Sequence, residues 1–536
     1  MMVFRSFFLY HVQSSSYKVG NIHGAKGVHI ISRTIFIKLN PYHHQFYLHF
    51  ILFYIFIFYI YNIQHTTYNI QHININMRTD DDNDDNHDTD CAAAFSTYFD
   101  RIKRHSRGSS SGMMSANLKS MYRNWFQQLR EADAFLHASP SFISAVVPDI
   151  MPTRGNRAAL PHPEMIGRGN DKLPFMTSEI TDYLEKTEVT HWLKYAASNI
   201  RGRSVIVHIL HCGSGSGSGV SLKRLNAYRS YVYKIYAWFH FIHPYQQQQQ
   251  QQQQQSQSSN KANLSGNECS KEINLYFYFT PFKKLLPRAP GTTLGPANAN
   301  TGFTYPCGMN PGPGGKKSTE IIIFRHEEWF KVLMHETFHN LELDFNTSSG
   351  TSLRSVFPGI RHDVIVSEAY VESWARILNV AFYVFYDIYG GNGTAAQYNT
   401  AVARCLPVER AFSLFQTVKT LKYMGLTFSD IVNPDPAVSS AAARKYAEDT
   451  NIFAYYVLAG MLVFNADEFM QWCISNNSVS LMQATHGERG TSPFKHFISG
   501  LCKNERMLEN IKLFETTDSV STPTQLRATM RMTAWS

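Results

Sequence analysis

Two histidines and a glutamate in the segment KVLMHETFHNL have the spacing of a metal site with a general base. Residues four apart on a helix of about 3.6 residues per turn lie on one face. His335 and His339 can therefore direct one ring nitrogen each at the same point, as a tetrahedral zinc ion requires. Glu336 is one step round the helix, where its carboxylate can reach a water molecule at the metal without ligating the metal. The spacing predicts one Zn²⁺ per chain with Glu336 as the catalytic base.

A catalytic zinc ion takes three protein ligands, so one more must come from elsewhere in the chain. A third histidine six residues after His339 is excluded, because that position is Phe345. Asp363 lacks the Gly-Thr-x-x-Asp context expected of an aspartate ligand. We therefore expect Glu368, in the helical pattern SEAYVESWARILN, to be the third ligand. Glu372 is one turn further on, and it is either the acceptor of a histidine N–H or an ordinary helix carboxylate.

The elements that must position these residues can be located from periodicity. Alternating apolar residues predict a strand over Glu272–Thr280, and residues 298–305 and 319–324 are two further strand candidates. A helical pattern covers residues 327–343, and the chain beyond Val364 is mostly helical. Strands followed by a mostly helical region predict an α+β fold.

Upstream of this region, the sequence predicts helices over residues 118–137 and 178–200 and a strand over 204–210. A Gly-Ser alternation and a run of glutamines follow within residues 212–261. Such sequence normally behaves as a flexible tether. We expect it to be an insertion in a surface loop of one domain.

The first part of the chain has an unusual composition. Residues 46–61 are almost entirely apolar and aromatic, a length just under the roughly 17–25 residues of a membrane-spanning helix. Two interpretations stay open: a membrane segment, or a non-native extension that precedes initiation at Met77 or Met113. We expect residues 1–113 to be a low-complexity N-terminal region.

The overall composition limits the partners. The formal net charge is +9, but no stripe dense in lysine and arginine is present, so a nucleic-acid partner is not expected. The seven cysteines are scattered and never form a C-x-x-C pair. That pattern excludes a disulfide framework and a thiolate zinc site, and it favours a reducing compartment.

The order of strand, Gly/Pro loop, TEIIIF strand, His-Glu-x-x-His helix and downstream glutamate helix resembles the gluzincin branch of the zincin fold. More narrowly, EEWFKVLMHETFHNLELDF and SEAYVESWA are similar to the metallopeptidases of large nucleocytoplasmic DNA viruses, from residue 114 onward without the glutamine-rich insertion. The resemblance implies a zincin upper lobe over 114–345, a helical lower lobe over 346–536, and His335, Glu336, His339 and Glu368 as site residues. It also implies that a small mixed sheet lies on the active-site helix, with 298–305 as the edge strand that pairs with a peptide substrate. It also implies location in the cytoplasm of an infected cell or in the virion.

The expected reaction is hydrolysis of a peptide bond in a peptide or protein substrate. An oxyanion partner is needed, and Tyr455, Tyr456 and His362 are the candidates. Three alternatives stay open: a catalytically silent zincin-fold binding or virion protein, a membrane-associated protein with an incidental histidine pair, and a deformylase-like hydrolase. The last needs a ligating cysteine in a specific glycine-containing loop, and Cys307 lacks that context.

Overall fold

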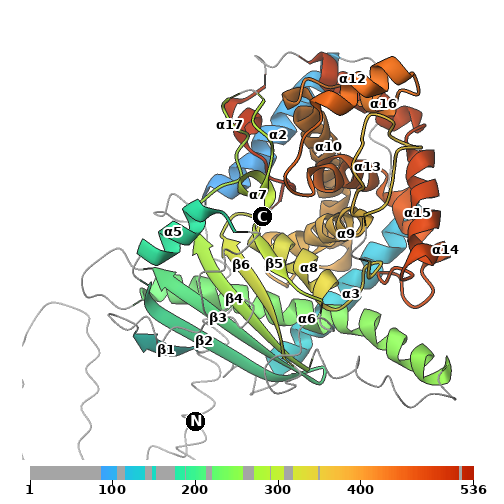
Figure 1. The fold of residues 1–536 in the computed structure, drawn as a ribbon. Coiled ribbons are helices and arrows are strands. Elements are labelled where there is room, and N and C mark those ends of the chain that lie inside the picture. The colour runs from blue at the N-terminus through green and yellow to red at the C-terminus, as the bar shows by residue number, and fades with distance from the viewer. Residues whose placement is uncertain are drawn as a thin grey trace, which may run out of the picture. The chain divides into compact units, whose positions relative to one another are not determined.

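A computed structural model describes most of the chain after residue 85 (Figure 1). The described residues are 86–105, 115–138, 148–152, 176–186, 189–212, 220–256, 271–289, 291–306, 318–347, 350–517 and 522–535. They belong to one compact unit, Asp81–Ser536. Residues 46–61 lie outside the described part. Within the described part, every helix falls short of the length or apolar content that a membrane span requires.

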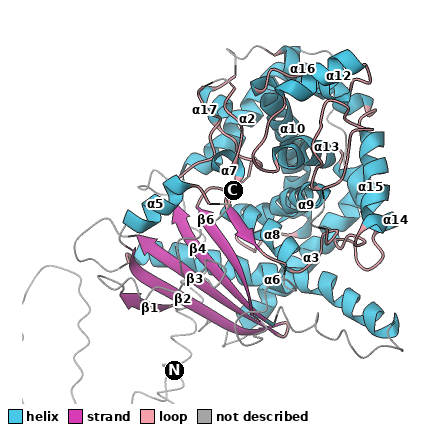
Figure 2. Cartoon of the chain, in the orientation of Figure 1, coloured by secondary structure: helices cyan, strands magenta, loops and turns pink. Residues whose placement is uncertain are grey.

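A mixed sheet of six strands forms the β part of the fold (Figure 2). Its strands are β1 (Asp149–Pro152), β2 (Val189–Ile200), β3 (Arg203–Cys212), β4 (Glu272–Thr280), β5 (Gly302–Thr304) and β6 (Ser318–Arg325), in the spatial order β1-β2-β3-β4-β6-β5. The central strands β3, β4 and β6 are parallel, and the outer pairs are antiparallel. The α+β class expected from the sequence is confirmed, and β5 is an edge strand inside the predicted stretch 298–305.

The other regular elements of the described chain are helices. They are α2 (Asn86–His105), α3 (Ala116–Ala138), α5 (Ser178–Lys186), α6 (Leu222–Ser256), α7 (Pro296–Ala299), α8 (Trp329–Asn340), α9 (Val366–Phe382), η6 (Tyr383–Ile388), α10 (Ala395–Tyr423), α11 (Phe428–Val432), α12 (Pro436–Lys445), η7 (Phe453–Leu458), α13 (Ala459–Phe464), α14 (Ala466–Asn476), α15 (Glu488–Leu501), α16 (Glu505–Thr516) and α17 (Thr524–Ala528). The segments η6 and η7 are π-helices. Helices α9, α10 and α13 pack against one another, and α9 also packs on α8.

The two faces of the sheet are both covered. Alternate residues of the parallel strands are opposite one another in register, for example Val207, Leu275 and Ile321. These side chains belong to the main core, which α6 and α8 also line. Residues whose side chains point to the opposite face, such as Ile322 and Phe324, pack with Ile180 of α5 in a second apolar cluster. Strand β6, which precedes helix α8, is therefore buried on both faces, which explains its continuous apolar sequence.

The expectation of a flexible insertion over residues 212–261 is wrong for its central part. Helix α6 begins at Leu222 and continues through the glutamine run to Ser256. Its side chains Val232, Ile235 and Trp238 are fully buried in the main core. The physical reason is topological: β3 and β4 are parallel neighbours, and a parallel pair needs a crossover connection, usually a helix.

The helix expected over residues 178–200 is half correct. Helix α5 ends at Lys186, and β2 follows from Val189. Along β2, Leu193, Tyr195 and Ala197 are buried, in the alternation of a strand. Pairing with β3 over most of its length selects the extended conformation over the helix.

The boundary expected at residue 113 is also wrong. Helix α2 lies before it and packs on α10 and α17. Phe95 of α2 is fully buried, with its ring 5.0 Å from that of Phe412 and 5.5 Å from that of Phe415. Residues 86–105 therefore belong to the folded unit. A chain starting near residue 113 would lack Phe95 and would leave the rings of Phe412 and Phe415 without this partner.

Candidate metal centre

Helix α8 carries the His-Glu-x-x-His segment between the sheet and the helical part. It follows β6 directly, and the chain reverses at Glu328, which has a φ of 58°. The carboxylate of Glu328 accepts the backbone N–H groups of Met532 and Thr533 at 2.8 and 2.6 Å, which anchors the start of the helix. Every residue of α8 except His339 is buried. The helix is thus enclosed on nearly all sides, and only the end that carries His339 approaches solvent.

Asn340, the last residue of α8, ties the helix to the edge of the sheet. Its side-chain amide donates to Thr304 Oγ1 of β5 at 2.9 Å and to Thr319 Oγ1 of β6 at 2.6 Å. The edge strand β5 is therefore held at a fixed place beside the histidines, which the sequence analysis did not anticipate.

His335, His339 and Glu368 bring three ligand atoms together from α8 and α9. Glu368 Oε2 lies 3.1 Å from His335 Nε2 and 3.2 Å from His339 Nε2, and the two nitrogens are 3.2 Å apart. Ligands of a tetrahedral zinc ion at about 2.0–2.1 Å from the metal are about 3.3–3.4 Å from one another. The triangle of atoms matches one face of such a tetrahedron to within about 0.3 Å. One ligand atom from each of the three residues lies within 4.8 Å of the other two, which is close enough for the group to hold a metal ion.

The outer nitrogen of each histidine is held by a second carboxylate. His335 Nδ1 lies 3.0 Å from Glu372 Oε2, and His339 Nδ1 lies 2.6 Å from Asp344 Oδ2. A neutral imidazole has a single N–H, and a carboxylate neighbour keeps it on Nδ1. The Nε2 lone pairs of both histidines then converge with the Glu368 oxygen. Three electron pairs directed at one point make a site for a cation.

The electrostatics of the cluster favour positive charge. Burial lowers the pKa of His339, but the carboxylates of Glu368 and Asp344 outweigh burial and hold it well above its usual range. Burial raises the pKa of Glu368, but the two histidines outweigh burial and hold it far below its usual range. The field that stabilises these protonation states would equally stabilise a divalent ion. The side chains of His335, His339 and Glu368 are 7%, 15% and 16% exposed, so an ion can reach them from solvent.

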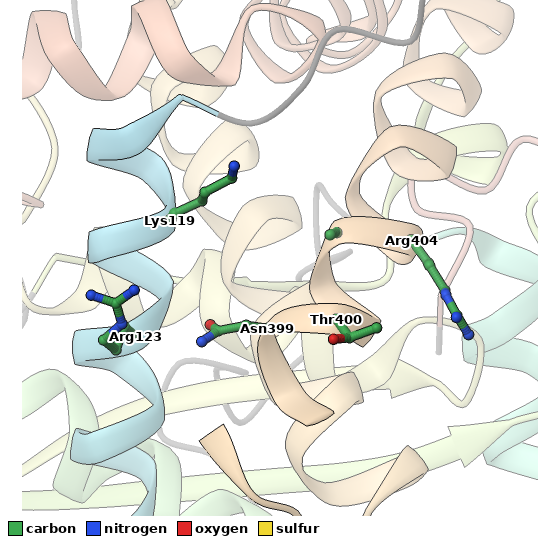
Figure 3. Close-up of a pocket in the computed structure, with 6 residues that line it drawn as sticks. Lys119, Arg123, Asn399, Thr400 and Arg404 are labelled. Atoms are coloured by element: carbon green, nitrogen blue, oxygen red, sulfur yellow. The ribbon is translucent and has the colours of Figure 1, made fainter. Parts of the chain in front are cut away.

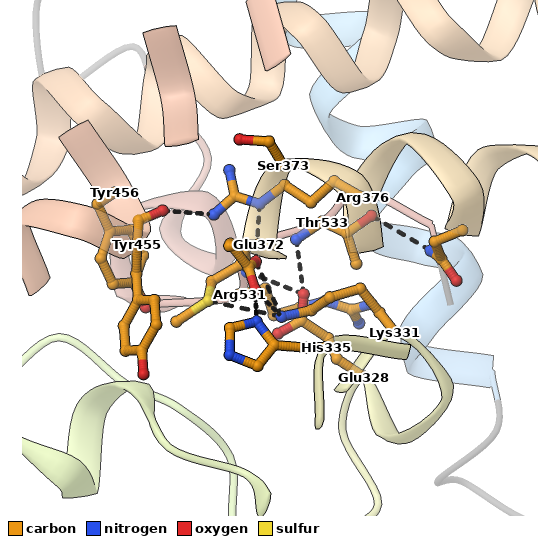
Figure 4. Close-up of polar contacts among 12 residues, drawn as sticks. Glu328, Lys331, His335, Glu372, Ser373, Arg376, Tyr455, Tyr456, Arg531 and Thr533 are labelled. Atoms are coloured by element: carbon orange, nitrogen blue, oxygen red, sulfur yellow. Dashed lines mark hydrogen bonds and ion pairs between the residues drawn. The ribbon is translucent and has the colours of Figure 1, made fainter. Parts of the chain in front are cut away.

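Glu372 is held in place by two buried cations (Figure 4). Its carboxylate accepts from Lys331 Nζ at 2.9 and 3.0 Å and from Arg376 Nε at 2.8 Å. Burial raises the pKa of Glu372, but Lys331 and Arg376 outweigh burial and hold it well below its usual range. Glu372 is therefore ionised and oriented where it meets His335. Of the two interpretations left open by the sequence, the structure places it against the histidine and not in solvent.

Glu336 has the surroundings of a general base. It is buried, and within the described part of the chain its carboxylate has no hydrogen-bond partner. Burial raises its pKa, while His335 and His339 act in the opposite direction. A carboxylate with a raised pKa and no competing donor can accept a proton and release it again near neutral pH.

The three oxyanion candidates differ in position. The Tyr455 ring lies 5.8 Å from that of His335, and Figure 4 shows the two side by side. The Tyr456 hydroxyl instead donates to Met530 O at 2.6 Å in a fully buried position, so the structure does not bring it to the cluster. His362 is engaged with Glu448, at 2.7 Å, and its ring stacks on Tyr446. Of the three, only Tyr455 is placed against a candidate ligand.

Sequence reasoning missed Asp344, Lys331 and Arg376. The signal for Asp344 was an acidic residue five positions after His339, just past the end of the helix. Lys331 and Arg376 stand four residues before His335 and four residues after Glu372, where helical spacing places them on the same faces. A charged residue on an otherwise apolar helix was the available clue in both cases.

A separate cavity lies between α3 and α10 (Figure 3). Its volume is about 410 Å³, and it is lined by Lys119, Arg123, Asn399, Thr400, Ala403 and Arg404. None of these residues belongs to the histidine cluster, so this cavity is not part of the candidate metal centre.

The chain matches no family model, no curated protein sequence and no solved structure.

Proposed function

We propose that the chain is a zinc-dependent peptidase of the gluzincin type, in which His335, His339 and Glu368 bind the ion. The observation that carries this proposal is the convergence of their three ligand atoms at 3.1–3.2 Å from one another. The carboxylates on both outer nitrogens support it further, because such partners are typical of histidine ligands.

Each residue of the site then has its own role in the proposed hydrolysis. Zinc in this site supplies a Lewis acid that activates water and polarises a carbonyl group. Glu336 takes the proton of the attacking water and passes it to the leaving amine, a role that its raised pKa favours. The Tyr455 hydroxyl donates a hydrogen bond to the oxyanion that develops on the substrate. Glu372 and Asp344 keep the imidazoles oriented throughout.

A peptide substrate is supported by the edge of the sheet. Strand β5 pairs with β6 on one side and is the last strand in the sheet, so its other side can pair with an extended backbone. Asn340 holds this strand beside the histidines. On the same grounds we propose a zincin-like fold, with the sheet on the active-site helix and the third ligand on a following helix.

The experiment is cleavage of a peptide library by the full chain, by Glu336→Gln and by Glu342→Gln. Glu342 lies three residues past His339, so its variant makes the same chemical change close by without touching a ligand. We expect cleavage by the wild type and Glu342→Gln, and a loss of about 100-fold or more in Glu336→Gln with its zinc retained. Cleavage that persists in Glu336→Gln would contradict the proposed base.

A second function is consistent with the same geometry. The metal cluster does not itself require Glu336, so a protein that binds zinc without turnover would show the same three-atom convergence. Zinc in the wild type with no cleavage of any library peptide would select this binding function over the peptidase.

A further inference from the structure

Four side chains that can carry positive charge meet at the β2–β3 turn. Arg201 lies in the turn itself, where Arg201 and Gly202 have φ values of 53° and 85°, and Arg203 is the first residue of β3. His240 and His243 come from α6, which packs on β2. Arg201 Nε donates to His240 Nε2 at 2.9 Å. The cluster shares no residue with the candidate metal centre.

Arg203 is buried without a partner. The residue is only 6% exposed, and its Nη1 is buried with no hydrogen-bond acceptor. Within the described part of the chain, neither a carboxylate nor a carbonyl oxygen binds the guanidinium. The buried Nδ1 of His243 also has no partner. Buried polar groups are almost always hydrogen-bonded, and a buried charge without a partner is costly, so two such groups together need an explanation.

The charges that act on this cluster within the described part of the chain are all of one sign. Burial, together with the neighbouring charges of Arg203 and Arg201, lowers the pKa of His243 to about 4. Burial alone lowers the pKa of Arg203 to about 10. The pKa of His240 is likewise lowered to about 4 by burial, Arg201 and His243. Among the described residues, the protein therefore provides positive charge and hydrogen-bond donors here without a compensating acid.

We propose that Arg201, Arg203, His240 and His243 form a binding site for an oxyanion of the phosphate type, carried by a small molecule or free in solution. A guanidinium presents its N–H groups in a planar fork that matches the oxygens of phosphate or carboxylate. The imidazole of His243, as the tautomer protonated on Nδ1, adds a neutral donor. An anion bound there satisfies both unpartnered groups and offsets the buried charge of Arg203.

The consequence for stability distinguishes this site from an ordinary buried arginine. An arginine without a partner destabilises the fold when no anion is bound, so its replacement by an apolar residue of similar size should stabilise it. Arg410 provides the matched control, because it is also 6% exposed but is paired with Asp467. Removing Arg410 leaves the Asp467 carboxylate without its cation and with the Ser115 backbone N–H as a donor, and should destabilise the fold.

The experiment is thermal unfolding of the full chain, Arg203→Met and Arg410→Met, in chloride buffer and with added inorganic phosphate. In chloride we expect the Tm of Arg203→Met to lie above that of the wild type and the Tm of Arg410→Met below it. Phosphate in large excess over its Kd should raise the Tm of the wild type and Arg410→Met by roughly 2–4 °C. It should leave Arg203→Met unchanged, which separates site binding from general salt stabilisation.

Acetate at the same concentration distinguishes the ligand source. A Tm increase with phosphate and not with acetate assigns the site to a phosphate group, and equal increases assign it to oxyanions in general. A Tm of Arg203→Met below that of the wild type in chloride would overturn the proposal, as would failure of this variant to fold. Equal phosphate shifts in the wild type and Arg203→Met would overturn it as well.

Discussion

Replacing Asp344 by alanine should weaken zinc binding without removing any ligand. Asp344 Oδ2 lies 2.6 Å from His339 Nδ1, a short distance typical of a charge-assisted hydrogen bond. A hydrogen bond to a charged group contributes about 1.5–3 kcal/mol, and every 1.4 kcal/mol is a factor of ten in affinity. Loss of such an outer partner typically costs about 10- to 100-fold in metal affinity. We therefore expect Asp344→Ala to raise the Kd for zinc by about 10- to 100-fold.

The assay is competition with a chromophoric chelator, with the unfolding temperature as a check on the fold. Asp344→Asn keeps one oxygen acceptor, which can serve His339 Nδ1 or the Asn346 backbone N–H but not both, so it should cost less than Asp344→Ala. Asp363→Ala removes one negative charge from an exposed site in the loop before α9 and should leave the Kd unchanged. A zinc Kd for Asp344→Ala equal to that of the wild type would refute the assignment of His339 as a ligand oriented by Asp344.

Three further outcomes are expected. Tyr455→Phe should lower kcat by about 100- to 1000-fold with zinc content unchanged, as steady-state kinetics and metal analysis would show. Burial raises the pKa of Glu409 to about 7, above its unfolded value of 4.5, so folded stability should fall as pH rises through this window. The unfolding free energy of Glu409→Gln minus that of the wild type, measured with urea, should therefore be about 3 kcal/mol larger at pH 8 than at pH 4. Phe95→Ala should lower the unfolding free energy by about 3–5 kcal/mol, measured in the same way at neutral pH.

Helix α8 could be predicted because all its information is local. The spacing of His335 and His339 and the apolar residues around them specify both the helix and the face that carries the two histidines. Glu368 could be found by elimination among few alternatives. Asp344 could not, because its approach to His339 depends on the turn after the helix, where Glu342 has a φ of 54°. A chain reversal at a non-glycine residue leaves little trace in the sequence.

The sheet was harder to predict than the helix because its contacts are distant in sequence. Residues 189–200 contain apolar residues at spacings that suit a strand or a helix, and only the partner strand β3 selects the strand. Helix α6 was hidden between two biased stretches, and the need for it follows from the parallel pairing of β3 and β4. Neither strand pairing can be derived from local periodicity. The wrong expectations for residues 178–200 and 212–261 therefore both come from contacts between residues distant in sequence.

The central claim is tested most directly by the zinc content of the purified full chain, measured beside His339→Ala and Glu368→Ala. The account predicts close to one zinc per wild-type chain and a large loss of zinc in both variants, with each variant still folded. A folded wild-type chain without zinc after exposure to the ion, or variants that retain it at full stoichiometry, would contradict a metal site formed by His335, His339 and Glu368.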